Sequence, residues 1–182
     1  MDEENKKSAI TVDSNCLTYL ITVMNDVLQP CGNLAAEKTA LFRILIYSPP
    51  IYYTNTVKEE YGKISNEERR EMHENESVLS YHPIIFGVSK IPNIADEYNK
   101  YHKGERRYRD CKILAEAELM NADVLLTYDD DFHRNLRSRS HHVKLLKPCE
   151  CWDMLAIRHG AKPKWRPIRN TNPMCNVTWW EW

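Results

Sequence analysis

The sequence predicts a three-layer α/β/α fold with a central, mainly parallel sheet, and two observations lead to this prediction. The first is a pair of short apolar runs, 9–13 and 124–128, which are typical of buried strands. The second is that segments with a helical spacing of apolar residues separate the strand-like runs. A chain of 182 residues is long enough to bury the core of one such domain.

Strands and helices alternate through the first half of the chain. The elements predicted there are a strand at 9–13, a helix from about Cys16, a helix at 34–48, a strand from 51 and a helix at 57–64. A turn at 13–15 is expected between the first strand and the first helix. Two prolines at 49–50 close the second helix, because proline cannot continue one.

The second half is more charged, and residues 65–79 predict either a solvated helix or a flexible excursion. The elements predicted after it are a turn at 92–93, a helix at 94–103, a helix at about 106–120, a strand at 124–128 and a short strand at 144–148. We divide the chain into a disordered tail (1–7), a main α/β domain (8–148) and a Trp- and Pro-rich extension packed on the core (149–182).

Charge and hydropathy limit the classes of partner. The chain has 25 Lys and Arg against 26 Asp and Glu, so its net charge of −1 gives no global basic field, and nucleic acid would have to bind a local patch. No apolar run approaches the ~20 residues of a membrane span. The charged N-terminus argues against a secretory signal, and six scattered cysteines fit free thiols. We therefore expect a cytoplasmic protein without a membrane partner.

Carboxylates follow both strand-like runs. Asp13 ends the first, and Asp129, Asp130 and Asp131 follow the second. Neighbouring carboxylates repel one another, so a folded protein tolerates them best in a solvated turn or around a cation. Carboxyl ends of buried parallel strands share one edge of the sheet, which predicts a metal site there.

Two helices add an acid at a position where the helical period predicts an apolar residue. Asp110 shares a stripe with Ile113 and Leu114, and Glu60 lies on the apolar stripe of its helix, whereas Glu59 is directed to solvent. An inward acid is costly unless it is paired or bound to metal. A salt bridge is the simpler explanation of either acid alone, but the four positions together favour a shared cation.

These residues resemble the PIN domain over residues 8–148. The resemblance rests on ITVDSN near the N-terminus, EEY in the middle, DCKILAEA on a helix and LLTYDDDF after it. It implies a nuclease with an acidic quartet, Asp13, Glu60, Asp110 and Asp129, and with Asp131 as a further metal ligand. It also implies that Asn15 and Thr127 support the acids, whereas Asp130 matches no functional position.

Oxygen-only ligands select hard cations, Mg²⁺ or Mn²⁺. The resemblance implies metal-dependent hydrolysis of RNA, which also needs positive charge near the acids. Basic residues flank Asp110 and Asp131. The substrate-binding candidates among them are Arg106, Arg107, Arg134 and Arg137, and the other flanking residues are Lys103, Arg109, His133, Arg139, His141 and His142.

Three functions remain open at the level of sequence. The first is a metal-dependent endoribonuclease, either the toxin of a toxin–antitoxin pair or a defence-associated nuclease. The second is a structure-specific DNA nuclease that uses the same acids. The third is a catalytically silent PIN-like module that binds RNA or protein. Candidate partners are therefore RNA, an antitoxin protein and a second copy of the chain.

Overall fold

The computed structural model describes residues 9–25, 27–48, 50–75, 80–81, 87–167 and 172–182. Its strands are β1 (Ile10–Val12), β2 (Ile51–Tyr53), β3 (Ser80–Tyr81), β4 (Val124–Leu126) and β5 (Lys144–Leu146). Its α-helices are α1 (Ser14–Asn25), α2 (Ala35–Tyr47), α3 (Asn55–Tyr61), α4 (Glu67–Asn75), α5 (Ile91–Asn99), α6 (Arg107–Leu119), α7 (Asp130–Leu136) and α8 (Pro148–Leu155). Two 3₁₀ turns are η1 (Val88–Lys90) and η2 (Pro173–Asn176).

The strands form one parallel sheet in the order β3-β2-β1-β4-β5. Thr11 of β1 is paired with Leu125 of β4, and the backbone N–H of Asp13 donates to the Leu126 carbonyl (3.0 Å), which extends this pairing past the end of β1. The predicted α/β fold with a mainly parallel sheet is confirmed.

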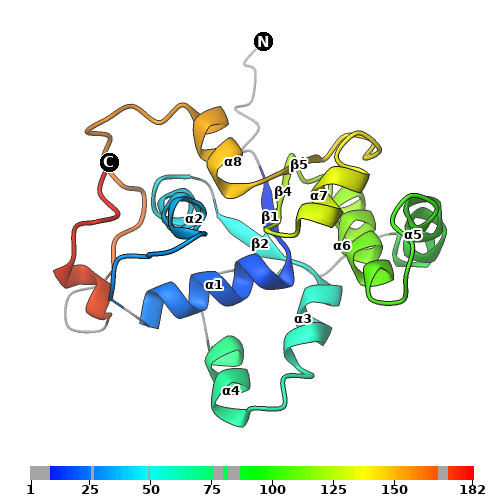
Figure 1. The fold of residues 1–182 in the computed structure, drawn as a ribbon, viewed down its shortest axis with the longest axis horizontal. Helices are drawn as coiled ribbons and strands as arrows, with labels where there is room; N and C mark the ends of the chain where they lie inside the picture. The colour runs from blue at the N-terminus through cyan, green and yellow to red at the C-terminus, as the bar shows by residue number, and fades with distance from the viewer. Residues whose placement is uncertain (1–8, 26, 49, 76–79, 82–86, 168–171) are drawn as a thin grey trace.

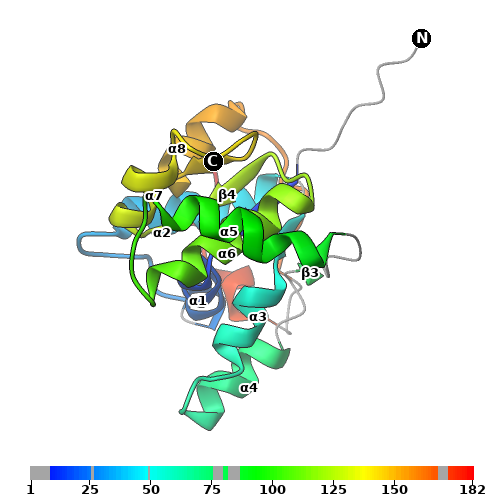
Figure 2. The same ribbon diagram turned by 90° about the vertical axis from the view of Figure 1, so that its right-hand side faces the viewer.

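Helices cover both faces of the sheet (Figure 1). The helices α1, α2 and α8 lie on one side of the strands, and α5 and α6 lie on the other. Both faces of the central strands are therefore buried, which is why Ile10, Val12, Leu125 and Leu126 are fully buried and the strands read as continuous apolar runs. The helix α4 stands off at one end of the molecule in both views (Figures 1 and 2).

The order of the strands reverses between β1 and β4. The chain builds β2 and β3 on one side of β1, and β4 and β5 on the other. At such a reversal the connections leave in opposite directions, so a crevice opens beyond the carboxyl ends of the two strands. Asp13 and Thr127 directly follow β1 and β4 and therefore lie at this crevice.

Several helix starts differ from the sequence prediction, and the starts of α1 and α5 have a clear physical reason. The helix α1 begins at Ser14, because Asp13 Oδ1 accepts the backbone N–H of Cys16 (2.7 Å) and so caps the segment expected to be a turn. The helix α5 begins at Ile91 and ends at Asn99, earlier than the predicted 94–103. Pro92 lies in its first turn, where a backbone N–H is not needed, so it does not interrupt the helix.

Among the strands and α-helices of the described residues, β3, α7 and α8 were not predicted. The helix α4 shows that the charged segment is helical over Glu67–Asn75, and β5 matches the short strand predicted at 144–148. The predicted tail at 1–7 lies outside the described residues. None of the helices in the described ranges combines the length and the apolar character of a membrane-spanning segment.

Candidate active site

The segments that carry the four predicted acids surround the carboxyl end of β1. Asp13 follows β1, Asp129 precedes α7, Asp110 lies in the first turn of α6 and Glu60 lies in the last turn of α3. The helix α3 packs against both α6 and α1. In Figure 1 the first turn of α1, α3 and the start of α6 lie around the point where β1 ends.

Asp13 is the buried member of the group. Its Oδ1 accepts the Cys16 N–H (2.7 Å) and its Oδ2 accepts the Thr127 hydroxyl (2.5 Å). Burial raises the pKa of Asp13 to about 6, and the negative charge of Asp110 adds to the rise, whereas the hydrogen bonds from Cys16 and Thr127 oppose it. A carboxylate in this position would be stabilised by additional positive charge.

Thr127 connects the ends of β1 and β4. Its hydroxyl donates to Asp13 and accepts the backbone N–H of Asp129 (3.0 Å). Asp129 in turn caps α7, because its Oδ1 accepts the Phe132 N–H (2.8 Å). The threonine therefore sets the position of one acid relative to the other.

Asp110 has a partner that the sequence did not reveal, the fully buried His102. The His102 Nε2 lies 2.8 Å from Asp110 Oδ2, and Asn135 of α7 holds the other ring nitrogen at 3.2 Å. Burial raises the pKa of Asp110, the contact with His102 opposes the rise, and the charge of Asp129 adds to it. No local pattern marks His102, because the contact depends on how α5, α6 and α7 pack.

Glu60 lies at the rim of the group. It accepts a hydrogen bond from the hydroxyl of Ser14, the neighbour of Asp13, and its Oε1 lies 3.8 Å from Arg109, the neighbour of Asp110. Its side chain is 21% exposed. Glu59 is exposed, as the helical spacing predicted.

Asp131 and the basic candidates form a separate set at the surface. Asp131 accepts from Arg107 of α6 (2.6 Å) and pairs with Arg134 of its own helix. Arg137 pairs instead with Glu150 of α8 (2.6 Å). Arg106 is exposed at the start of α6.

Asn15, expected to support the acids, is exposed in the first turn of α1. It lines a small hollow of about 160 Å³ that Glu60 also lines. Its side chain makes none of the hydrogen bonds described for the acids.

Asp110 therefore lies within electrostatic range of both Asp13 and Asp129, and Glu60 contacts the neighbours of Asp13 and Asp110. Within the described part of the chain, no group of three or more acidic, histidine or cysteine side chains is arranged so that it could hold a metal ion. Each of the four acids has a hydrogen-bond partner in the protein. The all-oxygen donor set and the raised pKa values fit a hard divalent cation by their chemistry.

A further buried acid, Glu116 of α6, was missed at the level of sequence. It follows Ile113 by three positions, so the spacing that marked Asp110 also marks Glu116. Its carboxylate accepts the backbone N–H (3.0 Å) and the hydroxyl (3.0 Å) of Thr56 in the first turn of α3. Its role is to hold α3, the helix that carries Glu60.

The chain matches no protein-family model and no curated protein. Among solved structures it is similar to VapBC2 from Rickettsia felis bound to a DNA fragment from their promoter, with 15% identity, a TM-score of 0.48, and coverage of 76% of this chain and 99% of that one. It is also similar to FitAcB from Neisseria gonorrhoeae, with 20% identity, a TM-score of 0.47, and coverage of 76% and 97%.

Proposed function

We propose that the chain is a PIN-domain-like, metal-dependent endoribonuclease. The observation that supports the proposal is that Asp110 lies within electrostatic range of Asp13 and of Asp129, beside the crevice where the strand order reverses. Two of these acids come from strand ends and the third from a helix. Burial raises the pKa of Asp13 and of Asp110, and perturbed carboxylates at such a crevice are typical of functional sites.

Asp13, Glu60, Asp110 and Asp129 would hold Mg²⁺ or Mn²⁺. When bound, such a cation polarises a phosphodiester oxygen and lowers the pKa of a water molecule. The contribution of Thr127 is to orient Asp13, and His102 orients Asp110. Orienting the acids in this way matters for the rate, because small displacements of groups at such a centre reduce the rate strongly.

Positive charge beside the acids supports a polyanionic substrate. Arg106, Arg107 and Arg109 lie at the start of α6, next to Asp110, and Arg134 lies on α7. Arg107 and Arg134 are paired with Asp131, so this carboxylate positions two guanidinium groups at the rim. These arginines would contact RNA phosphates, and their contribution should weaken as the salt concentration rises.

The test is cleavage of a panel of single-stranded RNAs in Mg²⁺ or Mn²⁺, with EDTA as the metal-free control. Asp129→Asn should lower the rate about 100-fold or more, since it removes a charged ligand while keeping the cap on α7. Asp130→Asn is the matched control, because Asp130 is exposed and pairs with Lys147 (2.8 Å) outside the acid group. It should cut RNA like the wild type.

Other outcomes would favour the alternatives. Equal loss in the two variants would contradict the assignment of the acids. RNA that is bound but never cut would favour the silent PIN-like module, and cleavage of DNA flaps without cleavage of RNA would favour the DNA nuclease.

This proposal also includes the role of a toxin, an antitoxin partner, a homodimer and a cytoplasmic location. Co-expression with the product of a small adjacent reading frame, followed by size-exclusion chromatography, would test for the antitoxin and the homodimer.

A further inference from the structure

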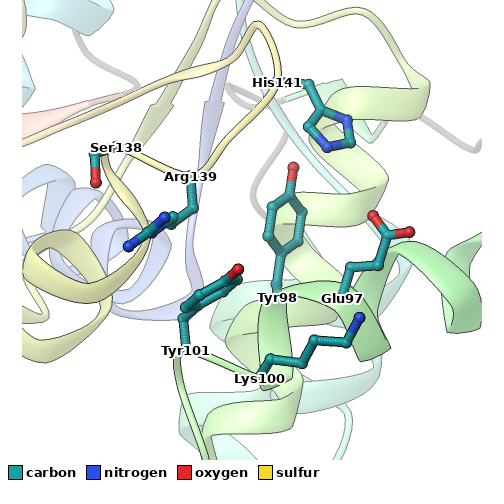
Figure 3. A pocket seen from close by; sticks show the side chains of 7 residues that line it. All are labelled: Glu97, Tyr98, Lys100, Tyr101, Ser138, Arg139 and His141. Atoms are coloured by element: carbon teal, nitrogen blue, oxygen red, sulfur yellow. The ribbon is translucent and has the colours of Figure 1, made fainter.

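A polar hollow of about 400 Å³ lies between the end of α5 and the segment that follows α7. Figure 3 shows the side chains that line it, with Arg139 reaching toward the ring of Tyr101 and with Lys100 and Glu97 together on the α5 side. We call it the Tyr101 pocket. Behind it, the buried Tyr98 donates to Glu118 (3.0 Å), which fixes its inner wall.

The walls of the Tyr101 pocket combine an accessible aromatic ring with positive charge. The Tyr101 side chain is 51% exposed although it is large and apolar. The Arg139 guanidinium lies over one face of the Tyr101 ring, 4.4 Å from its centre, so a base would stack on the opposite face or on the guanidinium itself. Lys100 and Arg139 bring two positive charges against the one negative charge of Glu97. An exposed ring beside cations is a surface on which a nucleobase can stack while its phosphate is neutralised.

Both walls of the Tyr101 pocket belong to segments that also contact the acid group. His102 directly follows Tyr101 and contacts Asp110, so the end of α5 is shared between the pocket and the acid group. The other wall follows α7, which Asp129 caps and whose Asn135 also contacts His102. A strand of nucleic acid that places one phosphate at the acids could therefore place a neighbouring nucleotide in the pocket.

We propose that the Tyr101 pocket is a nucleotide subsite for single-stranded RNA. One base stacks on Tyr101, and its phosphate contacts Arg139 and Lys100. The subsite selects unpaired RNA, because the bases of a duplex are already stacked and cannot reach the ring. This inference rests on the proposed ribonuclease function and adds the form of RNA and the residues that position it.

The experiment uses short single-stranded RNAs that carry 2-aminopurine, a fluorescent base quenched by stacking, at successive positions. Binding is measured in EDTA, so that cleavage does not contribute, and cleavage is measured separately in Mg²⁺ or Mn²⁺. The variants are Tyr101→Ala, with Tyr101→Phe to retain the ring, and Arg139→Gln. Arg158→Gln is the charge-matched control, since Arg158 is exposed in the C-terminal segment, beyond α8.

The wild type and Tyr101→Phe should quench 2-aminopurine at one position of the RNA, and Tyr101→Ala should not. Tyr101→Ala and Arg139→Gln should each raise the Kd about tenfold, and Arg158→Gln should leave it unchanged. In cleavage, the Tyr101→Ala variant should raise KM more than it lowers kcat, because the ring contributes to binding rather than to chemistry.

The subsite would be overturned, and the ribonuclease proposal left intact, if the wild type cleaves RNA while Tyr101→Ala and Arg139→Gln show unchanged quenching and Kd. Equal binding of duplex and single-stranded RNA would also overturn the subsite. Loss of quenching and binding in these variants, with no cleavage by the wild type, would support the subsite and refute the ribonuclease. A wild type that binds no RNA would overturn both.

Discussion

At the scale of single residues, the environment of Asp13 sets the most distinctive physical property of the site. This carboxyl group is 4% exposed and receives two hydrogen bonds from the protein, one from a backbone N–H and one from the Thr127 hydroxyl. These donors offset only part of the cost of burying the charge, so the pKa stays raised, at about 6. The protonated form is favoured in the folded protein more than in the unfolded chain.

The raised pKa predicts how stability depends on pH without metal. Between the ordinary value of 3.8 and about 6, folded Asp13 holds a proton that the unfolded chain has released. The free energy of unfolding therefore falls as the pH rises through this window, by about 3 kcal/mol in total. In EDTA, the melting temperature of Asp13→Asn relative to wild type should rise between pH 4 and pH 7.

The control for this experiment is Asp130→Asn. Lys147 lowers the pKa of Asp130, so any dependence on pH should have the opposite sign. A difference between Asp13→Asn and wild type that does not change with pH would contradict the raised pKa of Asp13.

At the scale of elements, the position of α3 depends on a side chain from α6. The first N–H groups of a helix have no partner within it, and Glu116 supplies one for Thr56. The negative charge also lies at the positive end of α3. Because α3 carries Glu60, this contact between two helices holds one member of the acid group.

Removing the carboxylate of Glu116 should therefore loosen α3. Glu116→Ala should lower the free energy of unfolding by about 1–3 kcal/mol, because it leaves a buried N–H and a buried hydroxyl without this acceptor. Glu116→Gln should cost less, since its amide oxygen can still accept from Thr56. Urea denaturation measures both changes. Glu59→Ala, which removes an exposed carboxylate of α3, should have little effect, and an equal loss in this variant would refute the role of Glu116.

At the scale of the whole molecule, the C-terminal segment is joined to α2. Arg43 of α2 donates to the backbone carbonyls of Trp180 (3.3 Å) and Glu181 (3.1 Å), and its guanidinium lies 4.7 Å from the Trp182 ring. Trp180 is buried beside Phe42. The division of the chain at residue 149 remains a proposal, and that position lies within α8.

The contacts of Trp180 predict that the C-terminal segment contributes to the stability of the core. Trp180→Ala should lower the free energy of unfolding by about 3–5 kcal/mol, as expected for a large buried ring. Leu28→Ala is the control, because Leu28 is 72% exposed, and its denaturation midpoint should not change. If Trp180→Ala unfolded at the same denaturant concentration as Leu28→Ala, the C-terminal segment would contribute nothing to the core.

Much of the fold and some of the site could be predicted from local patterns. The apolar runs before Asp13 and Asp129 identified the two central strands, because a strand covered on both faces needs apolar residues throughout. The helical period placed Asp110 on an inward stripe, because Ile113 and Leu114 follow it by three and four residues. The start of α1 was predicted two residues late, because the cap made by Asp13 was taken for a turn.

Sequence by itself determined which acids lie at strand ends and on inward helix faces, since these properties depend on residues close together in the chain. Only the tertiary structure decided that β4 lies beside β1, that His102 contacts Asp110 and that Asp131 pairs with Arg107. These contacts join segments that meet through strand pairing and helix packing, and no local period encodes which distant partner an inward polar group will find.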